Sequence, residues 1–307
     1  MEQKFQIVSD SSCDLPAELT AEKQIEVVPF YVSMNDTESM KEGVDISIRD
    51  FYELMVQNPK KFPKSSMPSV QDYADVFERY AKAGMPVVCI CITSKFSASY
   101  QSATVARAMV AETYPQAEIH VIDSAVDTVL QGIYVLEAVS MREAGYTAEQ
   151  TVKQLAEIQG SGRIFFTVGN LRYLQHGGRI GKLTGMAGAL LDIKPLITLK
   201  EGEIFPSGIC RGREKSKAIC RKLLLQYMKE VCRDSRELSI CIGYGYDRAE
   251  AEAFQSESVA FLNENGYAVS KEDLPLYQIG ATIGVHTGPY PLGFGVLRRH
   301  KGSTGVS

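Results

Sequence analysis

The 307-residue sequence lacks several features that define common protein classes. It has no apolar run near the ~20 residues that a membrane-spanning helix requires. Residues 1–5 do not begin the apolar segment of a cleaved signal peptide. The formal charge is only −4, from 33 basic and 37 acidic residues, which argues against a nucleic-acid binder. We therefore expect a cytoplasmic protein without a transmembrane segment.

Motifs of several catalytic and metal-binding classes are also absent. The sequence contains no GxxxxGK[ST] loop for nucleotide phosphates, no GxSxG turn of a serine hydrolase and no HExxH zinc motif. Its seven cysteines show no CxxC spacing, and Cys89 and Cys91 alternate within a strand-like run, so they should share one face. An odd number of cysteines in this arrangement indicates buried, reduced thiols rather than a metal site or a disulfide framework.

The first half of the chain predicts a doubly wound, mostly parallel α/β domain over residues 1–160. Its apolar runs are typical of strands that are covered on both faces of a parallel sheet. Capping signals mark the helices between these runs. The predicted strands lie at residues 7–8, 27–32, 87–92 and 119–122, and the predicted helices begin after Ser69, after residues 97–99, near Val129 and after Thr147.

The second half predicts an α+β domain over residues 161–300, with the boundary near the Gly-Ser-Gly of residues 160–162. Lys200-Glu201-Gly202 lies between two apolar segments, which is typical of a hairpin. Residues 301–307 read as a disordered tail. The remaining predicted elements are helices at 215–231 and 248–262 and strands at 238–242, 277–279 and 294–297.

Four short clusters, all rich in hydroxyl groups or glycine, are candidates for one binding site. His286, one of only four histidines, lies between Gly284 and Gly288, which permit positive φ and close approach to a ligand. In such a loop an imidazole can donate to an anion or titrate near neutrality. Together the clusters indicate a site that holds a small acidic group by neutral hydrogen bonds. The other three clusters are residues 64–69 (KSSMPS), 94–100 (SKFSASY) and 177–180 (GGRI).

Ser94 and Ser97 follow the predicted strand at 87–92 and precede a helix. Ligands of open α/β sheets bind at this edge, where helix N–H groups and the helix dipole favour an anion. Ser97 is equally suited to be the helix N-cap. Asp10 and Asp123 also occupy strand ends, where we expect them to brace loops.

Ser65 and Ser66 precede Pro68, which predicts an extended or turn-like loop with two hydroxyls able to face one ligand. Arg179 follows Gly178 in a tight turn, and its fork of donors suits a carboxylate or a phosphate. A surface salt bridge is the other interpretation of this arginine.

Taken in order, these motifs resemble the DegV family of bacterial fatty-acid-binding proteins. The resemblance extends from about Phe5 to Leu297. It is carried by residues 9–11, 28–29, 64–69, 94–103, 122–124, 173–174 with 177–180, 193–196, 211–213 and 286–289.

The resemblance implies a two-domain α/β protein that holds one long-chain fatty acid in a tunnel between its domains, without a metal or a cofactor. Members of the family present this fatty acid to an ATP-dependent fatty acid kinase, which forms an acyl phosphate. The implied carboxylate-binding residues are Ser65 and Ser97, with Ser66, Ser94, His286 and Thr287 beside them, and the implied head-group or partner surface comprises Gly178, Arg179, Arg211 and Arg213.

Two other functions stay open at this stage. One is a serine-dependent lipid esterase or thioesterase that uses Ser97 and His286, although the sequence identifies no acidic partner for the histidine. The other is a lipid-responsive regulator, and transient contact with a membrane surface also stays open. Tyr290 stands where the family usually has glycine, so we expect a changed pocket rim or partner surface.

Overall fold

The computed structural model describes residues 4–34, 38–186 and 193–302. It contains a four-stranded sheet in the order β2-β1-β6-β7 and a separate six-stranded sheet in the order β10-β9-β8-β13-β11-β12. All pairs in the first sheet are parallel, whereas the second is antiparallel except for β11 and β12. The predicted fold class, an α/β parallel sheet followed by an α+β part, is therefore confirmed.

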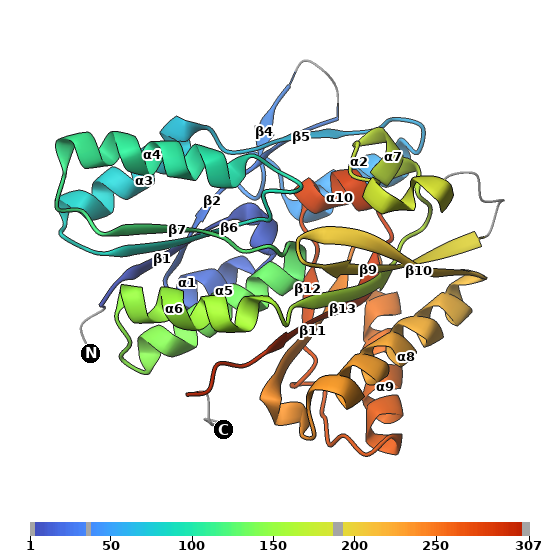
Figure 1. The fold of residues 1–307 in the computed structure, drawn as a ribbon. Coiled ribbons are helices and arrows are strands. Elements are labelled where there is room, and N and C mark those ends of the chain that lie inside the picture. The colour runs from blue at the N-terminus through green and yellow to red at the C-terminus, as the bar shows by residue number, and fades with distance from the viewer. Residues whose placement is uncertain (1–3, 35–37, 187–192, 303–307) are drawn as a thin grey trace.

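The parallel sheet lies between two layers of helices (Figure 1). Helices α3 and α4 cover one face, while α1, α5 and α6 lie on the other. The predicted N-cap at Ser69 and the predicted capping box of Thr147 and Gln150 are present, and Ser69 also forms a capping box with Asp72 at the start of α3. The elements are β1 (Gln6–Asp10), α1 (Ala17–Glu22), β2 (Ile25–Val28), α3 (Val70–Lys82), β6 (Val87–Cys91), α4 (Ser99–Thr113), β7 (Ile119–Asp123), α5 (Thr128–Glu143) and α6 (Ala148–Gln159).

The apolar run at residues 27–32 was expected to form one strand, and this prediction is wrong. The run is divided between β2, which ends at Val28, and β3 (Tyr31–Ser33), which belongs to a third sheet in the order β4-β3-β5. Pro29 lies between them and has no N–H to continue a strand ladder. Residues 64–66, expected in a loop, pair with β3 as strand β5. The other strand of this sheet is β4 (Met40–Lys41), and β5 spans Lys64–Ser66.

The six-stranded sheet has α8 and α9 on one face and α5 on the other. The predicted hairpin is present, with Glu201 and Gly202 at positive φ between β9 and β10. The elements are β8 (Arg163–Thr167), β9 (Ile193–Lys200), β10 (Glu203–Arg211), α8 (Arg213–Val231), β11 (Leu238–Tyr244), α9 (Arg248–Glu264), β12 (Leu276–Gln278) and β13 (Leu292–Arg298).

Three helices meet at one end of the molecule: α2 (Ile48–Gln57), α7 (Arg172–His176) and α10 (Ala281–Thr287) (Figure 1). Helix α10 comes late in the chain but packs against α2, β3 and β5 from the first half as well as against α7. His286 lies in the last turn of α10, so its expected loop position is wrong. Short 3₁₀ turns complete the described elements at Ser11–Cys13, Gly181–Met186 and Ser235–Glu237.

The proposed domain boundary at residues 160–162 falls between α6 and β8. The largest apolar core includes residues from both sides of this boundary, so the division into two domains stays a prediction. Residues 303–307 of the predicted tail lie outside the described residues. All seven cysteines are buried, and the Sγ atoms of Cys89 and Cys91 lie 3.7 Å apart on one face of β6, as expected. Within the described ranges, none of the helices has both the length and the hydropathy to cross a membrane.

Candidate ligand-binding cavity

A cavity of about 530 Å³ lies between segments of the two sequence halves. Its volume is within the roughly 300–1,000 Å³ of sites for small organic ligands. Residues from β5, from the loop before α4 and from α10 form much of its wall. The apolar part of the wall consists of Phe30, Met67, Ile92, Phe96, Ala98, Phe166, Leu174, Ile204 and Ile283.

Ser65 and His286 form a hydrogen-bonded pair of side chains in the cavity wall. Ser65 Oγ and His286 Nε2 share a hydrogen bond of 3.1 Å, although the two residues are 221 positions apart in the chain. The pairing of β5 with β3 fixes Ser65, because Val32 is its register partner. The C-terminal turn of α10 fixes His286. The structure therefore brings two of the predicted clusters into direct contact.

The other ring nitrogen of His286 faces backbone. Nδ1 is buried and has no hydrogen-bond partner among the described residues. A Cβ atom on Gly177 would lie 2.1 Å from this Nδ1, so only glycine permits the contact. Burial first, and the positive charge of Arg179 second, lower the pKa of His286 to about 4. The imidazole is consequently neutral at pH 7, which differs from the expected titration near neutrality.

Arg179 enters the cavity from a tight helix end. The N–H of Arg179 donates to Leu174 O and the N–H of Gly178 donates to Gln175 O, a Schellman motif at the end of α7, with Gly178 at φ +68°. The guanidinium donates through Nε and Nη2 to Phe96 O at 3.1 and 3.0 Å. No described carboxylate forms an ion pair with Arg179. The arginine thus joins the two halves at the cavity and retains an uncompensated positive charge.

Ser94 and Ser97 lie where strand β6 gives way to helix α4. Both line the cavity, and the helix N-terminus therefore faces it. Ala98, not Ser97, is the N-cap residue, while Ser97 Oγ accepts a 3.2 Å hydrogen bond from the N–H of Ser99. Ser97 therefore supports the first turn from one position further out, and its hydroxyl hydrogen is free to donate to a ligand.

Two aspartates brace this loop, as the sequence predicted. The buried carboxylate of Asp10 accepts hydrogen bonds from the N–H of Ile92 and from the Ser99 hydroxyl. Asp123 accepts the N–H of Ser94 at 3.1 Å. Both carboxylates hold backbone and are not part of the cavity wall.

The remaining predicted residues divide into two groups. Ser66 and Thr287 line the cavity, and the Thr287 hydroxyl donates to Ile283 O within α10. Gly178, Arg211 and Arg213 do not line it. Arg213 forms a two-pronged ion pair with Glu250 at 2.7 and 2.8 Å, and Arg211 is exposed at the end of β10. The structure therefore does not bring Arg211 or Arg213 to the head-group region, and their role at a partner surface stays a prediction.

The sequence did not single out Lys95 or Asp127, both of which line the cavity. Lys95 lies within the predicted 94–100 cluster, so the sequence could have identified it as a residue of the site. Asp127 precedes α5 and carried no comparable signal, because an aspartate at a helix start reads as an N-cap. The apolar wall residues were also missed, since they come from segments that meet only in the folded chain.

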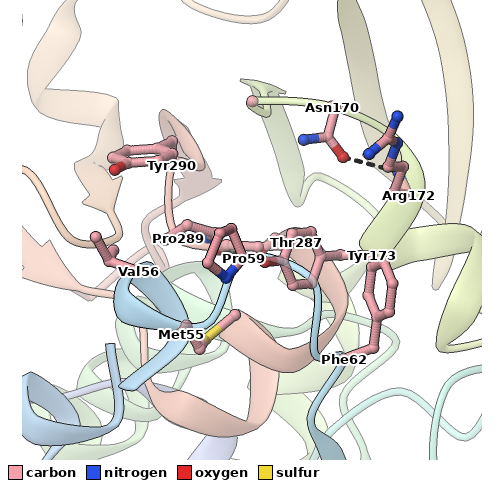
Figure 2. Close-up of a pocket in the computed structure, with 12 residues that line it drawn as sticks. Met55, Val56, Pro59, Phe62, Asn170, Arg172, Tyr173, Thr287, Pro289 and Tyr290 are labelled. Atoms are coloured by element: carbon pink, nitrogen blue, oxygen red, sulfur yellow. Dashed lines mark hydrogen bonds between the residues drawn. The ribbon is translucent and has the colours of Figure 1, made fainter. Parts of the chain in front are cut away.

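A second pocket of about 250 Å³ lies next to the cavity, with Thr287 in the wall of both. Figure 2 shows Tyr290 on one side of this pocket and Asn170 with Arg172 on the other. Tyr290 is 40% exposed and stacks edge-on against Tyr246, with ring centroids 6.3 Å apart. The rim that Tyr290 changes thus belongs to the second pocket.

The chemistry of the main cavity is that of a binding site for an acid with an apolar body. Hydroxyl groups, a neutral imidazole and one guanidinium gather at Ser65, Ser97 and Arg179, and apolar side chains form most of the rest. Within the described residues no cluster of acidic, histidine or cysteine side chains is suited to hold a metal ion.

Comparison with known proteins identifies relatives of this chain. The sequence profile of the family described as "Uncharacterised protein, DegV family" matches residues 4–299. A DegV domain-containing protein of Caldanaerobacter subterraneus is 33% identical over 293 residues, which cover 94% of this chain and 96% of that protein. The chain therefore belongs to the DegV family.

Solved structures show the same fold. A stearic-acid-binding protein from Eubacterium ventriosum is 42% identical, with a TM-score of 0.90 over 96% of this chain and 98% of that one. A DegV family protein from Thermus thermophilus is 28% identical, with a TM-score of 0.83 over 96% of this chain and 99% of that one. Its structure is described as showing fatty acid binding.

Proposed function

We propose that this protein binds one long-chain fatty acid, with the acyl chain in the 530 Å³ cavity and the carboxylate among Ser65, Ser97, His286 and Arg179. The observation that carries the proposal is the convergence of these four side chains, from four separate segments, on one largely apolar cavity. A carboxylate there accepts hydrogen bonds from hydroxyl groups and is attracted by the uncompensated charge of Arg179. Ser66, Ser94 and Thr287 line the same region.

The energetics assign separate tasks to the two parts of the site. Burial of an acyl chain contributes roughly 0.8 kcal/mol for each CH₂ group, which over ~16 carbons exceeds the contribution of about 1 kcal/mol from each neutral hydrogen bond. The apolar wall therefore supplies most of the affinity, while the polar cluster orients the chain. The relatives from Eubacterium ventriosum and Thermus thermophilus, which are described as binding fatty acids, support this proposal.

In this proposal the protein is a non-catalytic carrier in the cytoplasm, without a cofactor, that presents the carboxylate to an ATP-dependent fatty acid kinase. Arg179, next to the carboxylate, also stabilises the additional negative charge of an acyl phosphate. The exposed Arg211 and the half-buried Arg213 belong to the surface that meets the kinase.

The proposal is tested by extraction of the protein after expression in bacteria, followed by mass spectrometry of the lipid. We expect one intact fatty acid for each chain, with lower occupancy in Ser65→Ala and Ser97→Ala. Ser256→Ala is the matched control, because its hydroxyl lies on the exposed face of α9 and donates to Glu252 O. A chain that carries no acyl lipid and takes up none would refute the proposal.

The carrier role needs a second measurement. Acyl phosphate should form from the loaded protein only when both ATP and the fatty acid kinase are added. Acyl phosphate made by this chain and ATP alone, or none made with a functional kinase, would remove the carrier role and leave binding intact.

One observation favours a hydrolase as the second candidate, namely the hydrogen bond between Ser65 and His286. Serine hydrolases use such a pair together with a group that orients the histidine. Here the pair involves Ser65, not Ser97, and Nδ1 of His286 packs against Gly177 with no described carboxylate beside it. Sustained turnover of a p-nitrophenyl ester that is abolished by Ser65→Ala would establish the hydrolase.

A further inference from the structure

Asp127 is the one acidic residue in the wall of the cavity, as far as the described chain extends. Its side chain is only 8% exposed, and Oδ1 has no hydrogen-bond partner among the residues that the structure describes. A buried polar group without a partner is costly, so native structures retain few of them and each calls for an explanation.

Helix capping does not explain this carboxylate. Asp127 is the N-cap residue of α5, yet its side chain accepts no hydrogen bond from the first turn of that helix. At the N-caps of four other α-helices the side chain does accept such a bond, at Ser47, Ser69, Thr147 and Asp247. The Asp127 carboxyl is therefore not used as a helix cap, and the residue lines the cavity.

The head group of a fatty acid is a poor partner for Asp127. Ser65, Ser97 and Arg179 already offer donors and positive charge for a carboxylate, whereas Asp127 would repel it whenever Asp127 is ionised. Asp14 already shows this effect, since its pKa is raised by burial first, then by the charge of Glu42 and, to a smaller extent, by the charge of Asp127. Another part of the ligand is therefore the better partner for Asp127.

We propose that Asp127 is a specificity residue that selects fatty acids with a hydroxyl group on the acyl chain, through a hydrogen bond between that hydroxyl and the Asp127 carboxyl. This inference rests on the proposed fatty-acid binding. A plain acyl chain leaves the carboxyl unsatisfied, while a hydroxylated chain satisfies it. Sites built to bond a substrate hydroxyl discriminate strongly against the analogue that lacks it.

A hydroxyl group fits better than other substituents of an acyl chain. It can donate to an ionised carboxylate and can also accept from a protonated carboxyl, so it serves Asp127 in both states. An oxo group can only accept, and a double bond forms no comparable hydrogen bond. Burial raises the pKa of Asp127 to about 7, so both states are populated near neutral pH.

The test compares stearic acid with a series of monohydroxystearic acids that differ in the position of the hydroxyl. Equimolar mixtures are offered to delipidated protein and the bound acids are measured by mass spectrometry. For at least one isomer, we expect the wild type to prefer the hydroxy acid about tenfold over stearic acid. In Asp127→Leu, which has similar bulk but no polar atom, stearic acid should be preferred. Asp127→Asn should retain part of the preference for the hydroxy acid, because its amide still forms hydrogen bonds.

Each outcome decides between the two proposals. If the wild type binds stearic acid and prefers no isomer, this inference is overturned, whether or not the variants fold, while fatty-acid binding stands. Equal preferences in the wild type and Asp127→Leu overturn it as well, since the hydroxyl is then recognised elsewhere. If the wild type binds neither stearic acid nor any hydroxy acid, the proposed function itself fails.

Discussion

The hydrogen bond between Ser65 Oγ and His286 Nε2 joins a strand of the first half of the chain to a helix near its end. The histidine in this pair is neutral at pH 7, because burial and Arg179 lower its pKa to about 4. Ser65 and His286 therefore offer a carboxylate hydrogen bonds without a second full charge. Arg179 provides the only described cation that both lines the cavity and anchors its two sides through Phe96 O.

The neutral state of His286 predicts a particular pH dependence of stability. The pKa of His286 in the folded state is below the usual 6.5. The contribution of the neutral imidazole to the free energy of unfolding is therefore complete above pH 6.5 and is lost as the pH falls toward 4. Over that window the wild type should lose up to about 3 kcal/mol of unfolding free energy relative to His286→Gln. Denaturant titrations at several pH values measure this, with exposed His176→Gln as control. An NMR titration of His286 with a midpoint near 6.5 would contradict the prediction.

The buried carboxyl of Asp127 predicts the opposite pH dependence of stability. Burial raises its folded pKa to about 7, so the stability associated with the protonated carboxyl is lost as the pH rises from about 4 to about 7. Asp127→Asn should therefore gain stability relative to the wild type across this window, with an upper limit of about 4 kcal/mol. Chemical unfolding of delipidated protein at pH 5 and pH 8 provides the measurement, and Asp75→Asn on the exposed face of α3 is the control. A difference between Asp127→Asn and the wild type that does not change with pH would exclude a buried, titrating Asp127.

The contact between Gly177 and His286 predicts a steric effect that a second mutation relieves. Gly177→Ala would place Cβ 2.1 Å from His286 Nδ1, so the ring must move and its bond to Ser65 must break. We expect a loss of about 1–3 kcal/mol in stability and weaker fatty-acid binding. Gly160→Ala is the matched control, because Gly160 is also a helix C-cap with negative φ and has nothing within 4 Å of the added Cβ.

The double mutant Gly177→Ala/His286→Ala separates steric from backbone effects. In this background the added methyl group should be nearly neutral for stability, giving a coupling energy of about 1 kcal/mol or more. Strictly additive losses would show that Gly177 matters for another reason.

Arg179→Gln should weaken fatty-acid binding by at least about tenfold, since hydrogen bonds to charged groups contribute roughly 1.5–3 kcal/mol. The difference in affinity between the wild type and Arg179→Gln should become smaller as the salt concentration rises, because salt screens the attraction between Arg179 and the carboxylate in the wild type. Arg172→Gln, which changes an exposed arginine of the second pocket, should bind as the wild type does. Displacement of a fluorescent fatty acid at two salt concentrations measures both. Normal lipid binding by Arg179→Gln with reduced acyl-phosphate yield would instead assign the arginine to the kinase surface.

The sequence predicted those parts of the fold whose signals are local. The N-cap at Ser69, the capping box at Thr147 and the hairpin around Gly202 depend on neighbouring residues, and each is present. The strand at residues 27–32 failed because Pro29 ends one ladder and the chain then enters another sheet, a choice that depends on distant partners. Helix α10 was missed because Gly284 reads as a loop residue, whereas here it lies against Tyr52, where a Cβ would come within 2.9 Å of the hydroxyl oxygen.

The residues of the candidate site also divide into those with a local sequence signal and those that depend on the folded chain. Ser65, Ser97, Arg179 and His286 stand in short motifs, and the structure brings all four to one cavity. Arg211 and Arg213 stand in a motif of the same kind but lie elsewhere, because β10 ends away from α10 and Glu250 pairs with Arg213. The apolar wall and Asp127 could not be read from the sequence, since their common position exists only after the two sheets have packed.

Helix α5 has a consequence for how this molecule holds together. It lies between the two sheets, and most of its side chains, from Val129 to Met141, are buried. A helix that is buried on nearly all sides has no face left for water. If residues 1–160 were produced alone, α5 would expose one apolar flank, and residues 161–300 alone would expose the sheet that α5 covers. We therefore expect the two halves to unfold as one cooperative unit, and neither half alone to serve as an independent module for binding.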